Sequence, residues 1–161
     1  MRLYACIQDN LVVKVALFSD EEIREEGRQY QIIIDIQERI VPPQVGWVYQ
    51  DNKIILPELA GLTSEQVQIK KNLWRRDFGI QIKGPITDKL GARNIMLGKN
   101  SAFVMQMSSQ LGPIGMLLES GAITTSRNAL MSIRPYYAEH DDIFDEILQS
   151  INEYIAWIDN T

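Results

Sequence analysis

The chain has 161 residues, 45% apolar and 23% charged, which is the balance of an ordinary folded protein. This length fits one domain or two small ones. Cys6 is its one cysteine, so an intrachain disulfide is excluded. We expect no membrane span and no signal peptide. No apolar run approaches the roughly 20 residues that cross a bilayer, and the N-terminus lacks a long apolar stretch.

Charge is distributed unevenly along the chain. The net charge of −5 argues against a general nucleic-acid binder. Residues 69–99 are rich in Lys and Arg, whereas residues 136–161 carry Asp and Glu and contain neither Lys nor Arg. This segregation predicts that the basic segment and the acidic tail meet, either within one subunit or between subunits.

The N-terminal part predicts a small antiparallel β unit. A pair of β-rich runs flanks Asp9-Asn10, which is typical of a hairpin. A second pair flanks the polar turn Gln50-Asp51-Asn52. The expected strands are residues 2–8, 11–18, 30–36, 45–49 and 53–56.

Within this unit, a short polar helix is predicted by Ser19 followed three residues later by Glu22, the pattern of a capping box, and it should end at Gly27. Trp47 and Tyr49 lie two residues apart and therefore share one face of their strand. We interpret Trp47 as covering the end of the small sheet. A surface contact for a partner protein is the alternative.

The periodicity changes from 2 to 3.6 within residues 57–63, so we place a link there. The predicted fold class is α+β, with a small antiparallel β unit at residues 1–56 and a mostly helical domain at residues 64–161. Thr63 or Ser64 should cap the first helix of that domain. Gly84-Pro85 is expected to break it, with a further helical piece from Thr87.

Residues 111–135 predict two short helices joined by a bend. Gly121 stands where a C-cap glycine belongs, and Pro135 should end the second helix. The second helix should be capped by a side chain of Thr124, Thr125 or Ser126 and bury Leu130 and Ile133. The last helix has the most regular apolar stripe, which comprises Ile143, Ile147, Ile151, Tyr154, Ile155 and Ile158, broadened by Phe144, Leu148 and Trp157.

No reactive constellation emerges from the residue pattern. The glycines do not have the spacing of a phosphate-binding loop, and one His and one Cys cannot supply a zinc set. His140 beside Asp141 and Asp142 is the one candidate cluster, and neighbours on a helix point in different directions. We therefore predict no catalytic, metal or cofactor-binding residues and no cofactor.

A basic stretch near residue 70 has two interpretations. Four cations around an aromatic ring could meet phosphates and stack on bases. An ion-paired or solvated helix face is favoured, because the chain as a whole is acidic. Together with the aromatic pair of the β unit, the possible partner contacts are Trp47, Tyr49, Lys70, Lys71, Trp74, Arg75 and Arg76.

Most of the chain resembles small proteins encoded in the structural modules of tailed phages and prophages. One part of the likeness is the opening hairpin RLYACIQDNLVVKVALF with the acidic helix after it. Another is QIIIDIQERIVPPQVGWVYQDNKIIL, in which Gly46-Trp47-Val48-Tyr49 resembles the Gly-Trp-x-Tyr hairpin of those proteins, although Gln50-Asp51-Asn52 replaces the commoner Asp-Gly turn. The segments FGIQIKGPITDKLGARNIMLGKNSA and LLESGAITTSRNALMSIRP resemble their helical C-terminal halves.

The resemblance implies a non-enzymatic virion structural protein, a tail, baseplate or neck component. Such a protein would contact other virion or tail proteins, form a homo-oligomer, and be assembled in the host cytoplasm into the virion. One alternative is a tail-fibre assembly chaperone that is absent from the finished particle. A less favoured alternative is a nucleic-acid-binding accessory protein that uses the basic helix.

Overall fold

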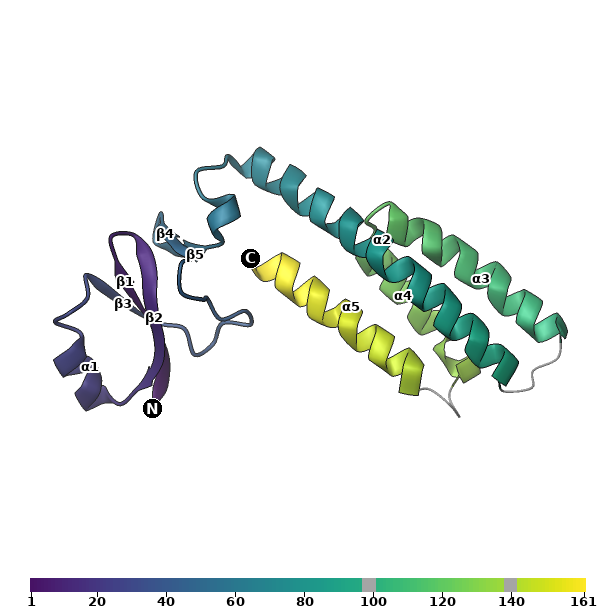
Figure 1. The fold of residues 1–161 in the computed structure, drawn as a ribbon, viewed down its shortest axis with the longest axis horizontal. Coiled ribbons are helices and arrows are strands. Elements are labelled where there is room, and N and C mark those ends of the chain that lie inside the picture. The colour runs from purple at the N-terminus through teal and green to yellow at the C-terminus, as the bar shows by residue number, and fades with distance from the viewer. Residues whose placement is uncertain (97–100, 138–141) are drawn as a thin grey trace. The chain divides into compact units, whose positions relative to one another are not determined.

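The computed structural model describes residues 1–96, 101–137 and 142–161, which form two compact units. The first contains Met1–Val67 together with Asp159–Thr161, and the second contains Gln68–Ile158. The strands lie in the first unit and the long helices form the second (Figure 1). This arrangement confirms the predicted α+β fold class.

The first unit is built on a five-stranded antiparallel sheet with the order β3-β1-β2-β4-β5. Both predicted hairpins are present, although the strand predicted over residues 45–49 is observed only as Val48–Gln50, so that Gln50 belongs to the strand and not to the turn. At their turns, Asp9, Asn10, Asp51 and Asn52 all have positive φ angles of 51° to 62°, the paired left-handed conformation that suits a two-residue hairpin. The strands are β1 (Arg2–Gln8), β2 (Leu11–Phe18), β3 (Ile32–Asp35), β4 (Val48–Gln50) and β5 (Lys53–Ile55).

The short helix α1 (Asp20–Glu26) begins and ends as predicted. The Ser19 side chain accepts from the Glu22 amide, the Glu22 side chain accepts from the Ser19 amide, and Gly27 is the C-cap. The main core of this unit consists of Ala5, Ile7, Val12, Ile36, Trp47 and Ile54. Since these residues come from β1, β2, β5 and the loops next to β3 and β4, the sheet and these loops fold around one shared interior.

The segment predicted as a link, residues 57–63, belongs to the first unit. It starts as the 3-10 turn η1 (Pro57–Leu59), and the Gly61 amide donates to Oε1 of Gln50 at 3.1 Å. The boundary between the units falls after Val67, inside helix α2. Thr63 caps that helix, since its hydroxyl accepts from the Gln66 amide at 3.2 Å.

The second unit is a bundle of four helices that pack around one apolar core (Figure 1). Its helices are α2 (Ser64–Met96), α3 (Ser101–Glu119), α4 (Ile123–Ile133) and α5 (Asp142–Asn160), with the 3-10 turn η2 (Arg134–Tyr137) after α4. As predicted, α4 ends before Pro135. The buried core residues are Ile86, Leu90, Met107, Leu111, Ile114, Leu118, Ile123, Leu130, Ile133, Phe144, Leu148 and Ile151.

The helix break predicted at Gly84-Pro85 is wrong, because α2 is one helix of 33 residues in which both residues and Thr87 lie. Proline removes one backbone donor and crowds the residue that precedes it. Glycine has no Cβ, so Gly84 tolerates the helical conformation in that crowded position. The same pair recurs as Gly112-Pro113 inside α3, which also continues.

The bend between α3 and α4 is only partly as predicted. Gly121 has the left-handed φ of +81° expected of a helix-ending glycine. The predicted Thr or Ser cap of α4 is wrong. The N-cap position holds Ala122, which makes no side-chain capping bond. Ser126 is buried instead, and its hydroxyl donates to the Ala122 carbonyl at 2.9 Å.

Candidate functional site

Trp47 lies in the interior of the first unit. Its side chain is 7% exposed and belongs to the core cluster of the sheet. The Trp47 carbonyl accepts from the Val12 amide at 2.8 Å, which ties the residue to β2. This position supports the interpretation that Trp47 covers the small sheet. The alternative prediction, that Trp47 is a surface contact for a partner protein, is wrong, because its ring is already buried in the unit.

Tyr49 of β4 lies beside the same core. Its ring is partly buried against the cluster, and its hydroxyl donates to Oδ1 of Asn52 at 3.1 Å. Asn52 is the second residue of the hairpin turn and has a φ of +62°. The hydrogen bond therefore braces the turn, which gives Tyr49 a structural role.

The five candidates on α2 do not form one continuous surface. Nζ of Lys70 lies 5.8 Å from the centre of the Trp74 ring, and Nη1 of Arg75 donates to Oδ1 of Asn72 at 3.0 Å. Arg76 is exposed. Because consecutive helical residues point in different directions, the basic side chains are spread around the helix.

Between α2 and α5 lies a cluster of four aromatic rings, Trp74, Phe78, Tyr154 and Trp157. Phe78 and Tyr154 are stacked at 3.7 Å between ring centres with an interplanar angle of 1°. Trp157 lies 5.5 Å from Trp74 and 5.7 Å from Tyr154 in tilted arrangements. The two tilted pairs have a favourable aromatic geometry, and the stacked pair adds buried ring surface. The four rings therefore join the first half of α2 to the C-terminal half of α5.

The cluster could have been found from spacing. Trp74 and Phe78 are four residues apart, and Tyr154 and Trp157 are three residues apart, so each pair shares a helix face. Helical spacing places each pair on a helix but does not show that the two faces meet. That pairing joins segments far apart in the chain, and local periodicity carries no information about it.

Burial of Tyr154 predicts that the free energy of unfolding depends on pH in the alkaline range. Its hydroxyl has no hydrogen-bond partner among the described residues, and burial raises its pKa to about 12. Below about pH 10 the Tyr154 hydroxyl is protonated in both the folded and the unfolded chain, so its ionisation does not lower the free energy of unfolding. Above that, the unfolded chain loses its proton first, so the free energy of unfolding should fall between about pH 10 and about pH 12.

This prediction can be checked by urea unfolding of the native chain and of Tyr154→Phe across that pH range. The variant should lose this part of the decline, and near pH 7 its stability should be unchanged or slightly raised, because an unpaired buried hydroxyl is removed. Equal pH dependence in both proteins would contradict the assignment.

Lys71 connects the basic segment to the acidic tail within one subunit. Its Nζ donates to the carbonyl oxygen of Ile158 at 2.8 Å. Ile158 lies in the last turn of α5, where carbonyl groups lack helical partners and a cation is favourable. Lys71 thus places a positive charge next to the negative C-terminal end of the α5 dipole, since the last turn of α5 contains no basic residue.

We predict that Lys71→Met lowers the free energy of unfolding by about 1–2 kcal/mol, because it removes a partly buried charged donor. Arg76→Met is the matched control. Arg76 is exposed, and its replacement should change stability by less than about 0.5 kcal/mol. Thermal unfolding of both variants tests this, and equal effects would show that the Lys71 contact is unimportant.

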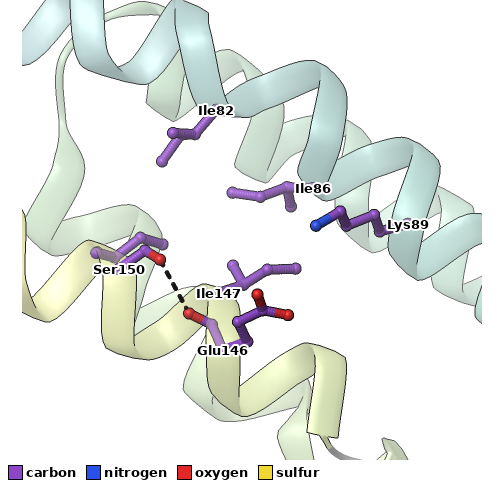
Figure 2. A pocket seen from close by; sticks show the side chains of 7 residues that line it. Ile82, Ile86, Lys89, Glu146, Ile147 and Ser150 are labelled. Atoms are coloured by element: carbon purple, nitrogen blue, oxygen red, sulfur yellow. Dashed lines mark hydrogen bonds between the residues drawn. The ribbon is translucent and has the colours of Figure 1, made fainter.

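The apolar hollow between α2 and α5 is too small for a cofactor. Figure 2 shows Ile82 and Ile86 of α2 opposite Ile147 of α5, with Lys89 and Glu146 on the facing helices. Its volume is about 120 Å³, whereas pockets for small molecules usually measure roughly 300–1,000 Å³. We interpret it as a packing defect of the bundle.

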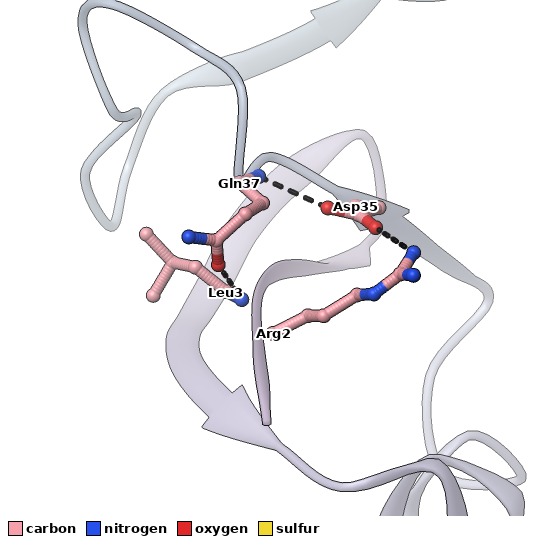
Figure 3. A network of polar contacts seen from close by, with 4 residues as sticks. All are labelled: Arg2, Leu3, Asp35 and Gln37. Carbon is pink, nitrogen blue, oxygen red and sulfur yellow. Dashed lines mark hydrogen bonds and ion pairs between the residues drawn. The ribbon is translucent and has the colours of Figure 1, made fainter.

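A polar network ties β1 to the end of β3 (Figure 3). Asp35 accepts from Nη1 of Arg2 at 3.2 Å and from the Gln37 amide at 3.0 Å, and Oε1 of Gln37 accepts from the Leu3 amide at 2.9 Å. The Asp35 oxygens and Oε1 of Gln37 are thus engaged within the unit. The network fixes the end of the strand.

An exposed apolar row on α2 is the clearest unused surface. Ile69, Leu73 and Ile80 are 54%, 53% and 51% exposed, respectively. Their spacing of four and seven residues places them on one helix face, and Arg76 lies within the same row. Phe78 points to the opposite side, where it packs against the core of the bundle.

Neither metal ligands nor membrane spans are found in the part of the chain that the structure describes. Within it, no three His, Cys, Asp or Glu side chains converge to hold a metal ion, and no helix is long and apolar enough to cross a membrane. The His140 and Asp141 part of the predicted cluster lies outside the described residues.

Comparison with known proteins gives no relative: no family model, no curated protein and no solved structure matches this chain.

Proposed function

We propose that this chain is a non-enzymatic structural component of a phage-like particle, in a tail, baseplate or neck, that acts through protein–protein contacts. The resemblance of its two hairpins and its helical half to phage structural-module proteins supports the particle class. The surface of the second unit supports the mode of action.

The observation that carries the proposal is the row of Ile69, Leu73 and Ile80 on α2. An exposed apolar patch with polar residues around it is typical of a protein interaction site. Arg76 within the row adds a residue type that is enriched at protein interfaces. A protein partner that covers this row would remove three large aliphatic side chains from water.

Nucleic-acid binding is less well supported by the same helix. Base stacking would need the face of Trp74, which packs against Trp157 at 5.5 Å. Phosphate binding would need Lys71, whose ammonium group donates to the Ile158 carbonyl. Protein contact therefore remains the better use of α2.

The proposal is tested by placing a charge in the row and following the protein into particles. Ile69→Glu should fold, because the side chain is exposed, and should be depleted from purified particles by at least about tenfold, since the contact would bury a carboxylate that has no Lys or Arg one turn away on its helix. Gln81→Glu adds the same carboxylate on an exposed position outside the row and should be incorporated normally. Equal incorporation of the two variants would contradict a role for the row.

A further inference from the structure

Strand β2 has an open edge over most of its length. On one side it pairs with β1 from end to end, whereas on the other side β4 pairs with its first residue, Leu11 (Figure 1). The Val12 backbone then bonds to Trp47 and Gly46 at 2.8 Å each. At Gly46, with a φ of +93°, the chain turns away from this edge, and the Trp47 amide closes the turn on the Gln44 carbonyl at 3.1 Å. Beyond Val12, β2 has no second neighbouring strand among the described residues.

The register of β1 and β2 shows which backbone groups the open edge presents. The Leu3 carbonyl accepts a backbone amide at 2.9 Å on the side of β3. Since successive residues of a strand bond to opposite sides, Tyr4 faces β2, where its partner is Ala16. The amide and carbonyl groups of Val15 and Leu17 therefore point to the open edge. Within the part of the chain that the structure describes, these groups have no hydrogen-bond partner.

The open edge lacks the charges and prolines that usually protect the edges of sheets. Between Val13 and Phe18 the one charged residue is Lys14, and its ammonium group is paired with Glu26 at 2.8 Å. The side chains of Val13 and Leu17 are 41% and 59% exposed. The edge thus offers backbone hydrogen bonds and apolar contact at the same place.

The two outer strands of the sheet are protected in ways that β2 is not. Strand β3 is four residues long and ends in Asp35, whose carboxylate pairs with Arg2 at 3.2 Å. On β5 the Ile54 carbonyl accepts from Nη2 of Arg39 at 3.1 Å. Addition of a strand is therefore favoured at β2.

The partner that matches this edge is an extended segment. Amide and carbonyl groups that alternate along one line are satisfied by another strand, and not by a helix, whose backbone groups bond within the helix. The charge of helix α1, which begins directly after the edge, selects the segment further. Its residues Asp20, Glu21 and Glu25 are exposed. Two copies joined through β2 would bring two acidic helices to one sheet, which like-charge repulsion disfavours, whereas a basic segment is attracted.

We propose that the open edge of β2 binds an extended basic segment of a partner protein as an added antiparallel strand. Apolar residues of the segment lie opposite Val15 and Leu17, and each of these two residues donates one backbone bond and accepts one. The antiparallel direction, which is that of every strand pair in this sheet, brings the N-terminal end of the segment to Phe18 and α1. Lys or Arg residues of the segment at that end face the acids of α1.

The first test measures binding of a fluorescently labelled peptide, acetyl-KKVTVTV-amide, to the purified full chain by fluorescence anisotropy at low salt. Its valines fall opposite Leu17, Val15 and Val13, and its lysines lie beside α1, so we expect saturable binding. The same peptide with N-methyl groups on its first two valines lacks the amides that bond to β2 and should not bind. The peptide EEVTVTV should bind at least about fivefold more weakly, because its charge is reversed. No binding of KKVTVTV, or equal binding of the N-methylated peptide, would overturn the proposal.

A pair of variants locates the site. Leu17→Lys should raise the dissociation constant of KKVTVTV by about fivefold, because it removes an apolar cross-strand contact and adds a like charge. Ile32→Lys is the matched control, since Ile32 is 37% exposed on β3, which β1 separates from β2. It should bind like the native chain, and equal effects of the two variants would overturn the location.

Hydrogen exchange of the native chain gives a readout that needs no variant. Without peptide, the amides of Val15 and Leu17 should exchange at least about tenfold faster than those of Ala16 and Phe18, which bond to β1, and KKVTVTV should slow them. Equal protection of all four amides would overturn the open edge. Protection that rises with protein concentration in the absence of peptide would show that a second copy occupies the edge, and this too would overturn the proposal.

The proposed strand site lies on the first unit and does not depend on the assignment to a particle. Peptide binding and hydrogen exchange use the purified chain, so their failure would leave the test of the α2 row by particle incorporation unaffected.

Discussion

Replacing Trp47 with alanine should lower the free energy of unfolding of the first unit by about 3–5 kcal/mol, the cost of removing a large aromatic side chain from a core. The indole is 7% exposed and contacts the interior formed with Ile7 and Ile54. The neighbouring side chains cannot fill a cavity of that size without rearranging the sheet. Urea unfolding followed by far-ultraviolet circular dichroism measures the loss.

Tyr49→Phe is the control from the same hairpin. It removes only the exposed hydrogen bond to Asn52 and should cost less than about 1 kcal/mol. The alternative interpretation, that Trp47 is a contact for a partner, predicts the reverse for Trp47→Ala. The unfolding transition would be unchanged, and that result would contradict the buried position.

Gly79→Ala should destabilise the helical bundle by up to about 3 kcal/mol, although alanine is the better helix former by about 1 kcal/mol. A Cβ at this position would collide with the backbone carbonyl oxygen of Leu118 in α3. Because a backbone atom cannot rotate away, α2 and α3 would have to separate along their contact. Thermal unfolding monitored at the helical signal tests the effect.

Gly115→Ala adds the same methyl group to the facing helix. There the new Cβ would lie 3.2 Å from Cε of Lys83, the flexible end of a side chain that can move. Stability should be unchanged or raised by up to about 1 kcal/mol. If both variants behave alike, the close approach of the two helices at Gly79 is not present in solution.

Features set by neighbouring residues could be predicted from the sequence. The hairpin turns at Asp9-Asn10 and Asp51-Asn52 and the Ser19–Glu22 capping box depend on local backbone geometry and local hydrogen bonds, and the structure has them. Gly121 is similar, since its left-handed φ is needed at a helix end whatever packs against it.

Features set by tertiary packing were harder to predict. Proline alone indicated a break at Gly84-Pro85, but the continuous helix gains packing along α2 that outweighs one lost hydrogen bond. Likewise, α4 begins at Ile123, whose side chain is buried in the bundle, without a side-chain cap.

The same limit applies to the residues predicted to contact partners. Residue type alone could not show that Trp47 is buried or that Lys71 reaches the end of α5, since both depend on segments far apart in sequence. The exposed row of Ile69, Leu73 and Ile80 was also missed, because an apolar helix pattern is normally assigned to the core.

The most direct test of the proposed structural role is quantitative mass spectrometry of phage-like particles purified from cells that encode this chain. If the chain is a tail, baseplate or neck component, it should sediment with intact particles in a fixed ratio to the other tail proteins and persist through washing at high salt. If it is found only in the fraction that does not sediment, the claim is contradicted, and the tail-fibre assembly chaperone becomes the better account.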